Sequence, residues 1–351
     1  MEMNSRDRVL FTFAHQETDR VPLWCGMSDE FQAKAMRELN VDAEGLLVRF
    51  GDDFRRVFAP YRGPTPALRH PDATWCSPFG VERHGLGYGQ PFDHPLAEAT
   101  LRDLETYPWP DPAFVDVSKV RQQAQRYGYR YAILGGDWSP FWHDAIDLVG
   151  METLMIRMFE DPEFVDAMLG RIVDYYAGAS KRIFEKADDE IDIFFFGNDF
   201  GSQTGPLVGP AEFERFLLPH VRRLVRLGHT YGLKTQMHCC GGIAQLLPLL
   251  IDAGLDAIHA VQPSCCGMDL PKLKADFGQH IVFNGAIDSH HILIDGTPET
   301  VRQKTCEVLD IMAPGGAYIA GASHDTVLEE TPVANMLAMC EAIRNWRKSK
   351  K

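Results

Sequence analysis

Residues 236–242 read QMHCCGG and place one histidine and two cysteines beside a pair of glycines. Side chains alternate along an extended segment, so His238 and Cys240 are expected on one side and Cys239 on the other. An imidazole nitrogen and a thiolate at this spacing can bind one cation, and zinc accepts both ligand types. Gly241 and Gly242 allow the backbone to turn sharply without a Cβ clash. The alternatives are a disulfide, dithiol redox chemistry and plain core packing.

A catalytic zinc site usually has three protein ligands and one open position, so a third ligand is needed. His324, in GASHDT, follows the last predicted strand, whereas Cys265 and Cys266 follow an earlier one in QPSCCG. Adjacent cysteines rarely pair, because the geometry is strained, and the chain has no C-x-x-C motif. The predicted metal ligands are His238 and Cys240, and the third ligand is open between His324 and Cys265 or Cys266.

The second half of the chain alternates strictly between helical and extended patterns. A predicted helix at 210–232 is followed by strands at 233–238, 255–261, 280–288 and 316–322, each separated from the next by a helix. Such alternation predicts βα units and a parallel sheet. The pairs Thr297-Pro298 and Thr331-Pro332 are predicted helix starts.

The first half follows the same rhythm less regularly. Strands are predicted at 20–24, 55–60, 131–137 and 191–199, and the segment 141–190 is expected to hold two or three helices. Together the halves give about eight strands, the number that closes a (β/α)₈ TIM barrel. We therefore predict an α/β fold with one barrel domain over residues 1–351. Residues 62–116 are interpreted as an inserted loop or hairpin after the second strand. An open doubly wound sheet is the alternative.

Polar residues gather where the predicted strands end, and in a barrel those carboxyl ends carry the chemistry. This rim predicts an enzyme, and its strand-end residues in chain order are Trp24, Asp137, Asp199, His238 with Cys240, Gln262, Asp288 and His324.

Two of these residues are predicted to be catalytic. Asp199 follows an almost wholly apolar strand, and a partly desolvated carboxylate has a raised pKa that suits proton transfer. Asp137 in LGGDWSPFW has the same character; both aspartates can alternatively be helix caps or turn formers. The predicted substrate-binding residues could in part be core aromatics or caps, and they are Trp24, Met27, Trp142, Asn198, Gln203, Gln262 and Asp288.

Composition excludes several classes of function. The net charge is −14, and no basic cluster precedes the RNWRKSKK tail, so no nucleic-acid partner is expected. No apolar run is long enough to cross a bilayer, and the N-terminus lacks the pattern of a signal peptide. Eight cysteines without a secretory signal indicate free thiols in a reducing, cytoplasmic compartment. A homodimer is compatible with these features.

Several segments resemble the uroporphyrinogen decarboxylase superfamily, and within it the branch of cobalamin-linked methyltransferases of the corrinoid and coenzyme M type. The resemblance covers nearly the whole chain. The segments that carry it are RDRVLFTFAHQETDRVPLW, HPLAEATLRDLETYPWPDP, GNDFGSQTGPLVGPAEFERFLLPHVRRLV, the His-x-Cys-Gly at 238–241, and APGGAYIAGASHDTVLEETPVANMLAM.

Two departures decide which branch is more similar. The tetrapyrrole decarboxylases carry Arg-Gln-Ala-Gly-Arg-Tyr soon after the first strand, whereas residues 22–31 here read PLWCGMSDEF without arginine. A polycarboxylate substrate would lose its bidentate arginine partners. The methyltransferase branch carries a distant cysteine as third zinc ligand, whereas the matching segment here is AGASHDT, in which His324 is the substitute.

The resemblance implies a zinc-dependent methyltransferase. It would move a methyl group between a small O-, N- or S-methyl substrate, or a thiol or pterin acceptor, and a corrinoid protein. No D-x-H-x-x-G loop is present, so a separate partner protein must supply the corrinoid (cobalamin). One rival is a metal-independent decarboxylase or lyase of a small non-porphyrin substrate that uses Asp52 or Asp53 with Asp199. Another is a non-catalytic binding subunit.

Overall fold

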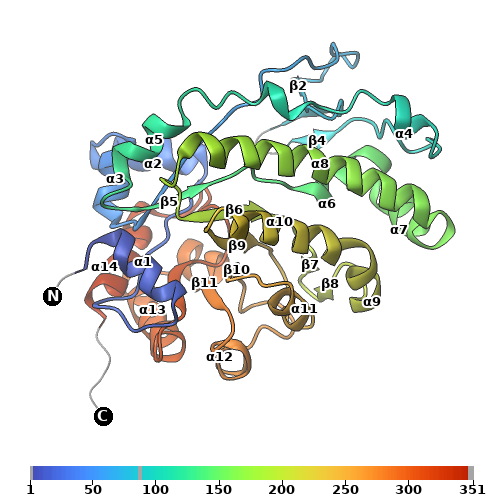
Figure 1. Cartoon of the computed structure of the whole chain (residues 1–351). Helices are drawn as coiled ribbons and strands as arrows, with labels where there is room; N and C mark the ends of the chain where they lie inside the picture. The colour runs from blue at the N-terminus through green and yellow to red at the C-terminus, as the bar shows by residue number, and fades with distance from the viewer. Residues whose placement is uncertain (1–2, 86–88, 347–351) are drawn as a thin grey trace.

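A curled parallel sheet forms the centre of the molecule (Figure 1). The computed structural model describes residues 3–85 and 89–346. Seven strands pair in parallel, in the order β1-β5-β6-β9-β10-β11-β12. Their bounds are β1 Phe54–Arg56, β5 Ala132–Gly135, β6 Ile193–Gly197, β9 Lys234–His238, β10 Ala257–Val261, β11 Val282–Ile287 and β12 Tyr318–Ala322.

The two edges of this sheet meet at the segment around Leu23. Leu23 forms a parallel bridge with Ala320 of β12, where the N–H of Trp24 donates to the Ala320 carbonyl at 2.9 Å. On its other side the Leu23 carbonyl accepts from the N–H of Asp53, 3.0 Å away, immediately before β1. The predicted strand at 20–24 is therefore reduced to a bridge, and Pro22 within it has no N–H to donate. The architecture is TIM-barrel-like, as the sequence indicates.

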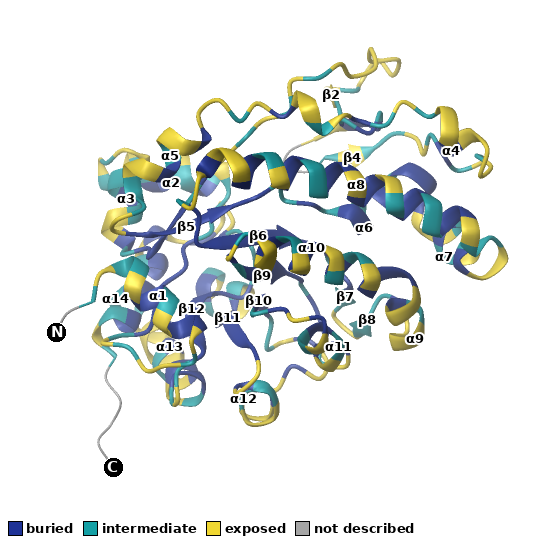
Figure 2. Cartoon of the chain, viewed as in Figure 1, coloured by how far each residue is buried: buried dark blue, intermediate teal, exposed yellow. Residues whose placement is uncertain are grey.

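Helices cover the outside of the sheet (Figure 1). The segment 141–190 holds three of them, in agreement with the sequence prediction. In Figure 2 the strands are buried, and the helices turn their exposed residues outward. The helices are α1 Ser5–Phe13, α2 Asp29–Leu39, α3 Ala43–Phe50, α4 Asp103–Thr106, α5 Val120–Tyr127, α6 Phe141–Val149, α7 Met151–Glu160, α8 Pro162–Ala187, α9 Pro210–Glu212, α10 Leu218–Thr230, α11 Leu247–Asp252, α12 Leu270–Phe277, α13 Pro298–Met312 and α14 Val333–Asn345.

The buried apolar residues form two clusters. The larger lies between the sheet and the helices, and the smaller includes Trp24, Phe54 and Phe195 together with Val9 and Phe13 of α1. β6 is buried along its whole length because both of its faces are covered, as is usual for a parallel strand.

Two predicted helices differ from expectation at particular residues. The helix predicted at 210–232 is interrupted by a π-helical turn, η2 (Phe213–Leu217), between α9 and α10. Thr297 caps α13 through its side chain, with Pro298 at the first helical position, as predicted. At the second Thr-Pro pair, α14 begins only at Val333, because Pro332 takes the N-cap position.

Residues 62–116 contain a small antiparallel sheet of three strands, β2-β3-β4. The strands are β2 Trp75–Cys76, β3 Glu82–His84 and β4 Gln90–Pro91, and α4 and the 3₁₀ turn η1 (Pro112–Phe114) follow them. This sheet has no strand in common with the central parallel sheet.

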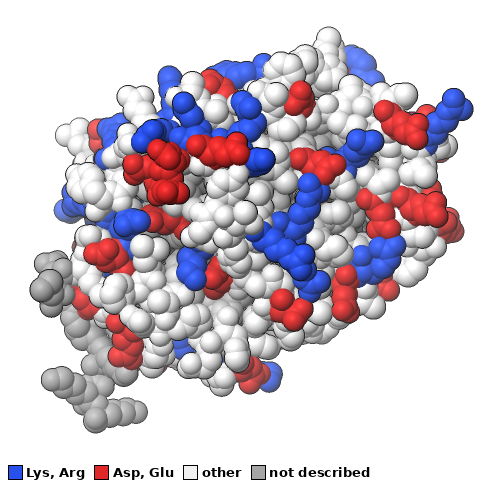
Figure 3. Space-filling view, viewed as in Figure 1, with Lys and Arg blue, Asp and Glu red and all other residues white. Residues whose placement is uncertain are grey.

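Charged side chains of both signs are mixed over the face shown in Figure 3. Three arginines near or within α10 illustrate this mixing, because each is paired with an acidic residue of a neighbouring segment: Arg215 with Asp166, Arg222 with Asp252 and Arg223 with Asp174. Within the described ranges, no helix is both long enough and apolar enough to span a bilayer.

Candidate metal centre

The end of β9 brings His238 and Cys240 together. Nε2 of His238 lies 3.1 Å from Sγ of Cys240. Cys239 points the other way, is 1% exposed, and accepts a hydrogen bond from the N–H of Phe200 at 3.3 Å. The predicted alternation is confirmed, and all eight cysteines are free thiols.

Gly241 provides the sharp turn that follows. Its φ is +94°, and a Cβ there would come within 2.6–2.8 Å of backbone atoms of Gly201 and Ser202. Only glycine fits this close approach. The Gly241 N–H donates to Oε1 of Gln262 at 2.7 Å, so Gln262 holds the turn.

Asp199, at the end of β6, joins the pair. Its Oδ1 lies 3.3 Å from Nε2 of His238 and accepts from the N–H of Cys240 at 2.9 Å, and its Oδ2 lies 3.2 Å from Nε2 of His143. Burial alone would raise the pKa of Asp199, but hydrogen bonds from His143 and then His238 outweigh it and lower the pKa below its ordinary value. The predicted raised pKa is therefore wrong for Asp199, because two imidazoles face its carboxylate.

The second nitrogen of His238 faces another histidine. Nδ1 of His238 lies 3.1 Å from Nδ1 of His259 on β10. Burial opposes the charged form of His238, but Cys240 and Asp199 raise its pKa well above the ordinary value. Burial, followed by the charge of His238, lowers the pKa of His259 well below it. The buried pair therefore holds its proton on the His238 side.

Two groups of three side chains in the described part of the chain could hold a metal ion. One is Asp199, His238 and Cys240, the other is His238, His259 and Asp325, and within each group the ligand atoms lie within 4.8 Å of one another. The first group offers nitrogen, sulfur and oxygen, a donor set that suits zinc. Metal binding there would displace a proton from His238, because a ligating histidine is neutral.

The predicted third ligands lie outside both groups. Nδ1 of His324 is 3.1 Å from the carbonyl of Thr326. Sγ of Cys265 donates to Oε1 of Gln262 at 3.4 Å, and Cys266 is exposed. Of the candidates, His324 alone lines the cavity beside His238.

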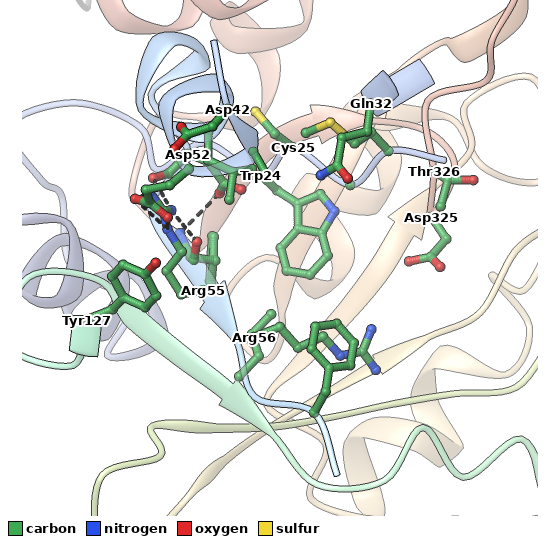
Figure 4. Close-up of a pocket in the computed structure, with 18 of the residues that line it drawn as sticks. Trp24, Cys25, Gln32, Asp42, Asp52, Arg55, Arg56, Tyr127, Asp325 and Thr326 are labelled. Carbon is green, nitrogen blue, oxygen red and sulfur yellow. Dashed lines mark hydrogen bonds and ion pairs between the residues drawn. The ribbon is translucent and has the colours of Figure 1, made fainter. Parts of the chain in front are cut away.

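This cavity, about 510 Å³ in volume, opens beside the His238–Asp199 pair. It is lined by Met27, Ser28, Asp29, Glu30, Trp138, His143, Asp199, His238, His324, Asp325 and Thr326. A second cavity of about 580 Å³ shares Met27, Asp325 and Thr326 with it and extends past Trp24. In the view of Figure 4, the Trp24 indole lies between Arg55 on one side and Asp325 on the other. Of the predicted substrate-binding residues, Trp24 lines the second cavity and Met27 lines both.

Asp137, after β5, lies beside a third cavity with Arg56, Trp138 and Asp325. Burial raises the pKa of Asp137 to about 6, against a smaller opposing effect of the hydrogen bond from Ser139 N–H. The predicted raised pKa therefore applies to Asp137.

Three predicted substrate-binding residues have structural contacts, and a fourth is exposed. Trp142 is fully buried in the core, because α6 turns it inward. Asn198 is buried and accepts from the N–H of Trp142 at 2.8 Å while donating to the Ser139 carbonyl at 3.0 Å. Asp288 caps the π-helical turn η3 (Ser289–Ile294), and Gln203 is exposed near the β-hairpin of β7 (Gly201–Ser202) and β8 (Gly205–Pro206).

Sequence reasoning missed three residues of the centre: His143, His259 and Asp325. Two of them carried a usable signal. His143 lies six residues after Asp137 on the helix that follows the same strand, and His259 interrupts an otherwise apolar strand at a position level with His238.

Comparisons with known proteins agree on one family. The sequence model described as uroporphyrinogen decarboxylase (URO-D) matches residues 92–346. The methylcobamide:CoM methyltransferase MtbA of Methanosarcina acetivorans is 24% identical over 232 residues, which cover 65% of this chain and 62% of that protein. The uroporphyrinogen decarboxylase of Alkalilimnicola ehrlichii is 23% identical over 369 aligned positions, covering 98% of this chain and 94% of that protein. The chain thus matches less than two thirds of the length of the first of these relatives.

A solved structure of a methyltransferase from Methanosarcina mazei has the same fold. It aligns with 98% of this chain and 99% of its own, with a TM-score of 0.68 and 17% sequence identity.

Proposed function

Because the chain belongs to the uroporphyrinogen decarboxylase family, we propose that it is a zinc-dependent methyltransferase of that family. It would move a methyl group between a small O-, N- or S-methyl substrate, or a thiol or pterin acceptor, and a corrinoid. The observation that carries this proposal is the convergence of a thiol, an imidazole and a carboxylate at Cys240, His238 and Asp199, beside an open cavity.

These three side chains would hold the zinc, and the cavity side would remain open for a substrate heteroatom. Asp199 replaces His324 in this set, since His324 lies outside the group of converging ligand atoms. Zinc bound there would lower the pKa of a thiol acceptor, or would polarise the bond between the heteroatom and the methyl group of a donor.

The remaining roles fall to residues around the zinc ligands. His143 orients the Asp199 carboxylate through a contact of 3.2 Å. Trp138, whose ring centroid lies 5.6 Å from that of His238, forms an apolar wall. Asp137, with its pKa of about 6, is suited to take up or release a proton near neutral pH.

The corrinoid would come from a partner protein. The relatives named as methylcobamide:CoM and methylated-thiol–coenzyme M methyltransferases support this part of the proposal. The chain's own contribution would be the cavity mouth, against which the corrinoid of the partner would lie.

Charge at the mouth favours methyl transfer over decarboxylation of a polycarboxylate. Among the described residues that line the cavity beside His238 there are four carboxylates and no Lys or Arg. The rival mechanism needs Asp52 or Asp53 together with Asp199. Both precede β1, at the opposite end of the strands from Asp199, and Asp53 is fully buried in ion pairs with Arg8 and Arg20.

Metal analysis of the purified chain tests the proposal. We expect about one zinc per chain, lost in His238→Ala and in Cys240→Ser and retained in the control Cys266→Ser, whose thiol is exposed and outside the group. Wild-type protein with candidate methyl donors should convert added cob(I)alamin to methylcobalamin, followed by the visible spectrum. A metal-free protein whose activity survives both substitutions would contradict the proposal, and zinc binding without any methylation would point to a binding subunit.

A further inference from the structure

The His238 imidazole has one nitrogen on the proposed metal side and one on the opposite side. Nε2 faces Cys240 and Asp199 at 3.1 and 3.3 Å, whereas Nδ1 lies 3.1 Å from Nδ1 of His259. His238 and His259 are register partners on the adjacent strands β9 and β10. A hydrogen bond between two imidazole nitrogens requires one that carries a proton and one that does not.

We infer that His259 is a positioning residue that fixes the tautomer and ring orientation of His238 for metal binding. This inference rests on the proposed function. When Nε2 of a neutral His238 offers its lone pair to a metal, the ring proton must be on Nδ1. That Nδ1–H then donates to Nδ1 of His259, which accepts and must carry its own proton on Nε2.

Packing holds His259 in the orientation that this hydrogen bond needs. The ring is fully buried, and its centroid lies 4.9 Å from Trp24 and 5.5 Å from Phe195. A half-turn of the ring would present a carbon to His238 in place of Nδ1 and would lose the contact. His259 Nε2 is buried and has no hydrogen-bond partner in the described structure, so Nδ1 makes the polar contact of this ring with His238.

The residue that contacts Nδ1 of His238 affects the net charge of the proposed metal site. Metal-bound histidines commonly donate their second N–H to a carboxylate or a carbonyl. Asp199 and Cys240 already bring negative charge to this site, and a further carboxylate behind His238 would add more. A neutral imidazole orients the ligand without adding charge, which leaves the bound metal a stronger Lewis acid.

His259 has one competing role, as a ligand. With His238 and Asp325 it forms the second group of possible ligands, in which Asp325 Oδ1 lies 4.0 Å from Nδ1 of His259. A metal there would have to use Nδ1 of His238 and would have no thiolate. The two roles predict different behaviour of matched variants.

The test compares His259→Phe with His259→Asn. Phenylalanine keeps a ring between Trp24 and Phe195 but offers no acceptor, whereas the asparagine Oδ1 occupies about the place of the imidazole Nδ1. Phe195→Leu is the packing control, because it alters the same aromatic group without touching the hydrogen bond. The measurements are zinc affinity by chelator competition, the visible spectrum of the cobalt(II)-substituted protein, and thermal unfolding of the metal-free protein.

We expect His259→Phe to bind zinc about 10- to 100-fold more weakly and to shift the thiolate-to-cobalt absorption. His259→Asn should recover most of the affinity and the wild-type spectrum, and Phe195→Leu should stay within about threefold of wild type. Equal affinity and spectra in His259→Phe and wild type would overturn the inference. Equal losses in the Phe and Asn variants, with Phe195→Leu unaffected, would overturn it in favour of a ligand role. Wild-type protein that binds neither metal would overturn the proposed function itself and this inference with it.

Discussion

The carboxylates at the two ends of the central strands have different kinds of partner. Before β1, the fully buried Asp53 carboxylate accepts from Arg8 at 2.9 Å, from Arg20 at 2.7 and 2.8 Å, and from the N–H of Leu23 at 2.8 Å. After β6, Asp199 is paired with two histidines and one backbone N–H, with no arginine.

On the proposed function, this difference separates a structural end from a reactive one. Arginine stays charged at any ordinary pH, so the Asp53 pairs persist and fix the N-terminal helix to the barrel. Histidine can exchange its proton for a metal ion, so the partners of Asp199 can change during binding. Asp53 thus has partners that are always charged, whereas the proposed ligand Asp199 has histidine partners whose charge can change.

The largest expected effect is at the structural end. Asp53→Asn removes the buried counter-charge that Arg8 and the partly exposed Arg20 share, although Arg8 keeps its pair with Asp19, and should lower the free energy of unfolding by about 3–5 kcal/mol. Urea unfolding measures this change. Asp166→Asn is the control, since its pair with Arg215 is exposed and should contribute less than about 1 kcal/mol. A loss below about 1 kcal/mol for Asp53→Asn would remove the contrast between the two ends.

At the Asp199 end, a substitution should change zinc affinity more than it changes the free energy of unfolding. Asp199→Asn keeps the shape of the side chain but weakens a ligand, so zinc affinity should fall about 10- to 100-fold, or about 1.4–2.8 kcal/mol. The free energy of unfolding of the metal-free protein should change by less, because the histidine partners, unlike arginines, can lose their charge when the carboxylate is replaced. Chelator competition and urea unfolding on the same samples decide this. Unchanged zinc affinity would exclude Asp199 from the ligand set.

Asp137 provides a pH-dependent test of the same end. Its pKa of about 6 lies above the ordinary 3.8, so the folded chain holds this proton more tightly than the unfolded chain does. The contribution to stability is therefore complete below about pH 4 and is lost as the pH rises through about 6. Because the Asp137 side chain is partly exposed, we expect the pH-dependent change in the free energy of unfolding to be only about 1–2 kcal/mol, and we expect it to disappear in Asp137→Asn. Parallel pH profiles of unfolding for the variant and wild type would contradict the burial of this carboxyl.

The smallest effect is expected at His324. Its ring contacts the Thr326 carbonyl and lies outside the group of converging ligands, so His324→Ala should change zinc affinity by less than about threefold. The same chelator titration measures it. A loss as large as that of Asp199→Asn would restore His324 as the third ligand and identify the geometry around Asp199 as that of the metal-free state.

Much of the fold follows from local patterns. Each of the strands β6, β9, β10, β11 and β12 lies within a segment predicted from the alternation of helical and extended patterns, and the α13 start follows from Thr297 and Pro298. The π-helical turns were missed, because they depend on tertiary contacts rather than on a repeating pattern. Residues 62–116 were interpreted as a loop or hairpin, and the three strands of their antiparallel sheet were not located.

The residues of the candidate site that directly follow a predicted strand could be predicted from the sequence. His238, Cys240 and Asp199 each follow a recognisable strand, and the alternation of side chains gives their direction. The role of His259 depends on strand register, which places it level with His238 and which no single sequence reveals. The low pKa of Asp199 depends on His143, whose approach is set by the packing of α6.

The seam at Leu23 has a consequence for access to the interior. A single bridge and a few backbone hydrogen bonds join the two edges of the sheet there, whereas β11 and β12 are paired over five residues. Local opening at Leu23 breaks fewer hydrogen bonds than opening between β11 and β12, so the amides of Trp24 and Ala320 should exchange with solvent before those of β11. The same segment carries Met27 into both neighbouring cavities, so an opening of the seam would also change the shape of these cavities.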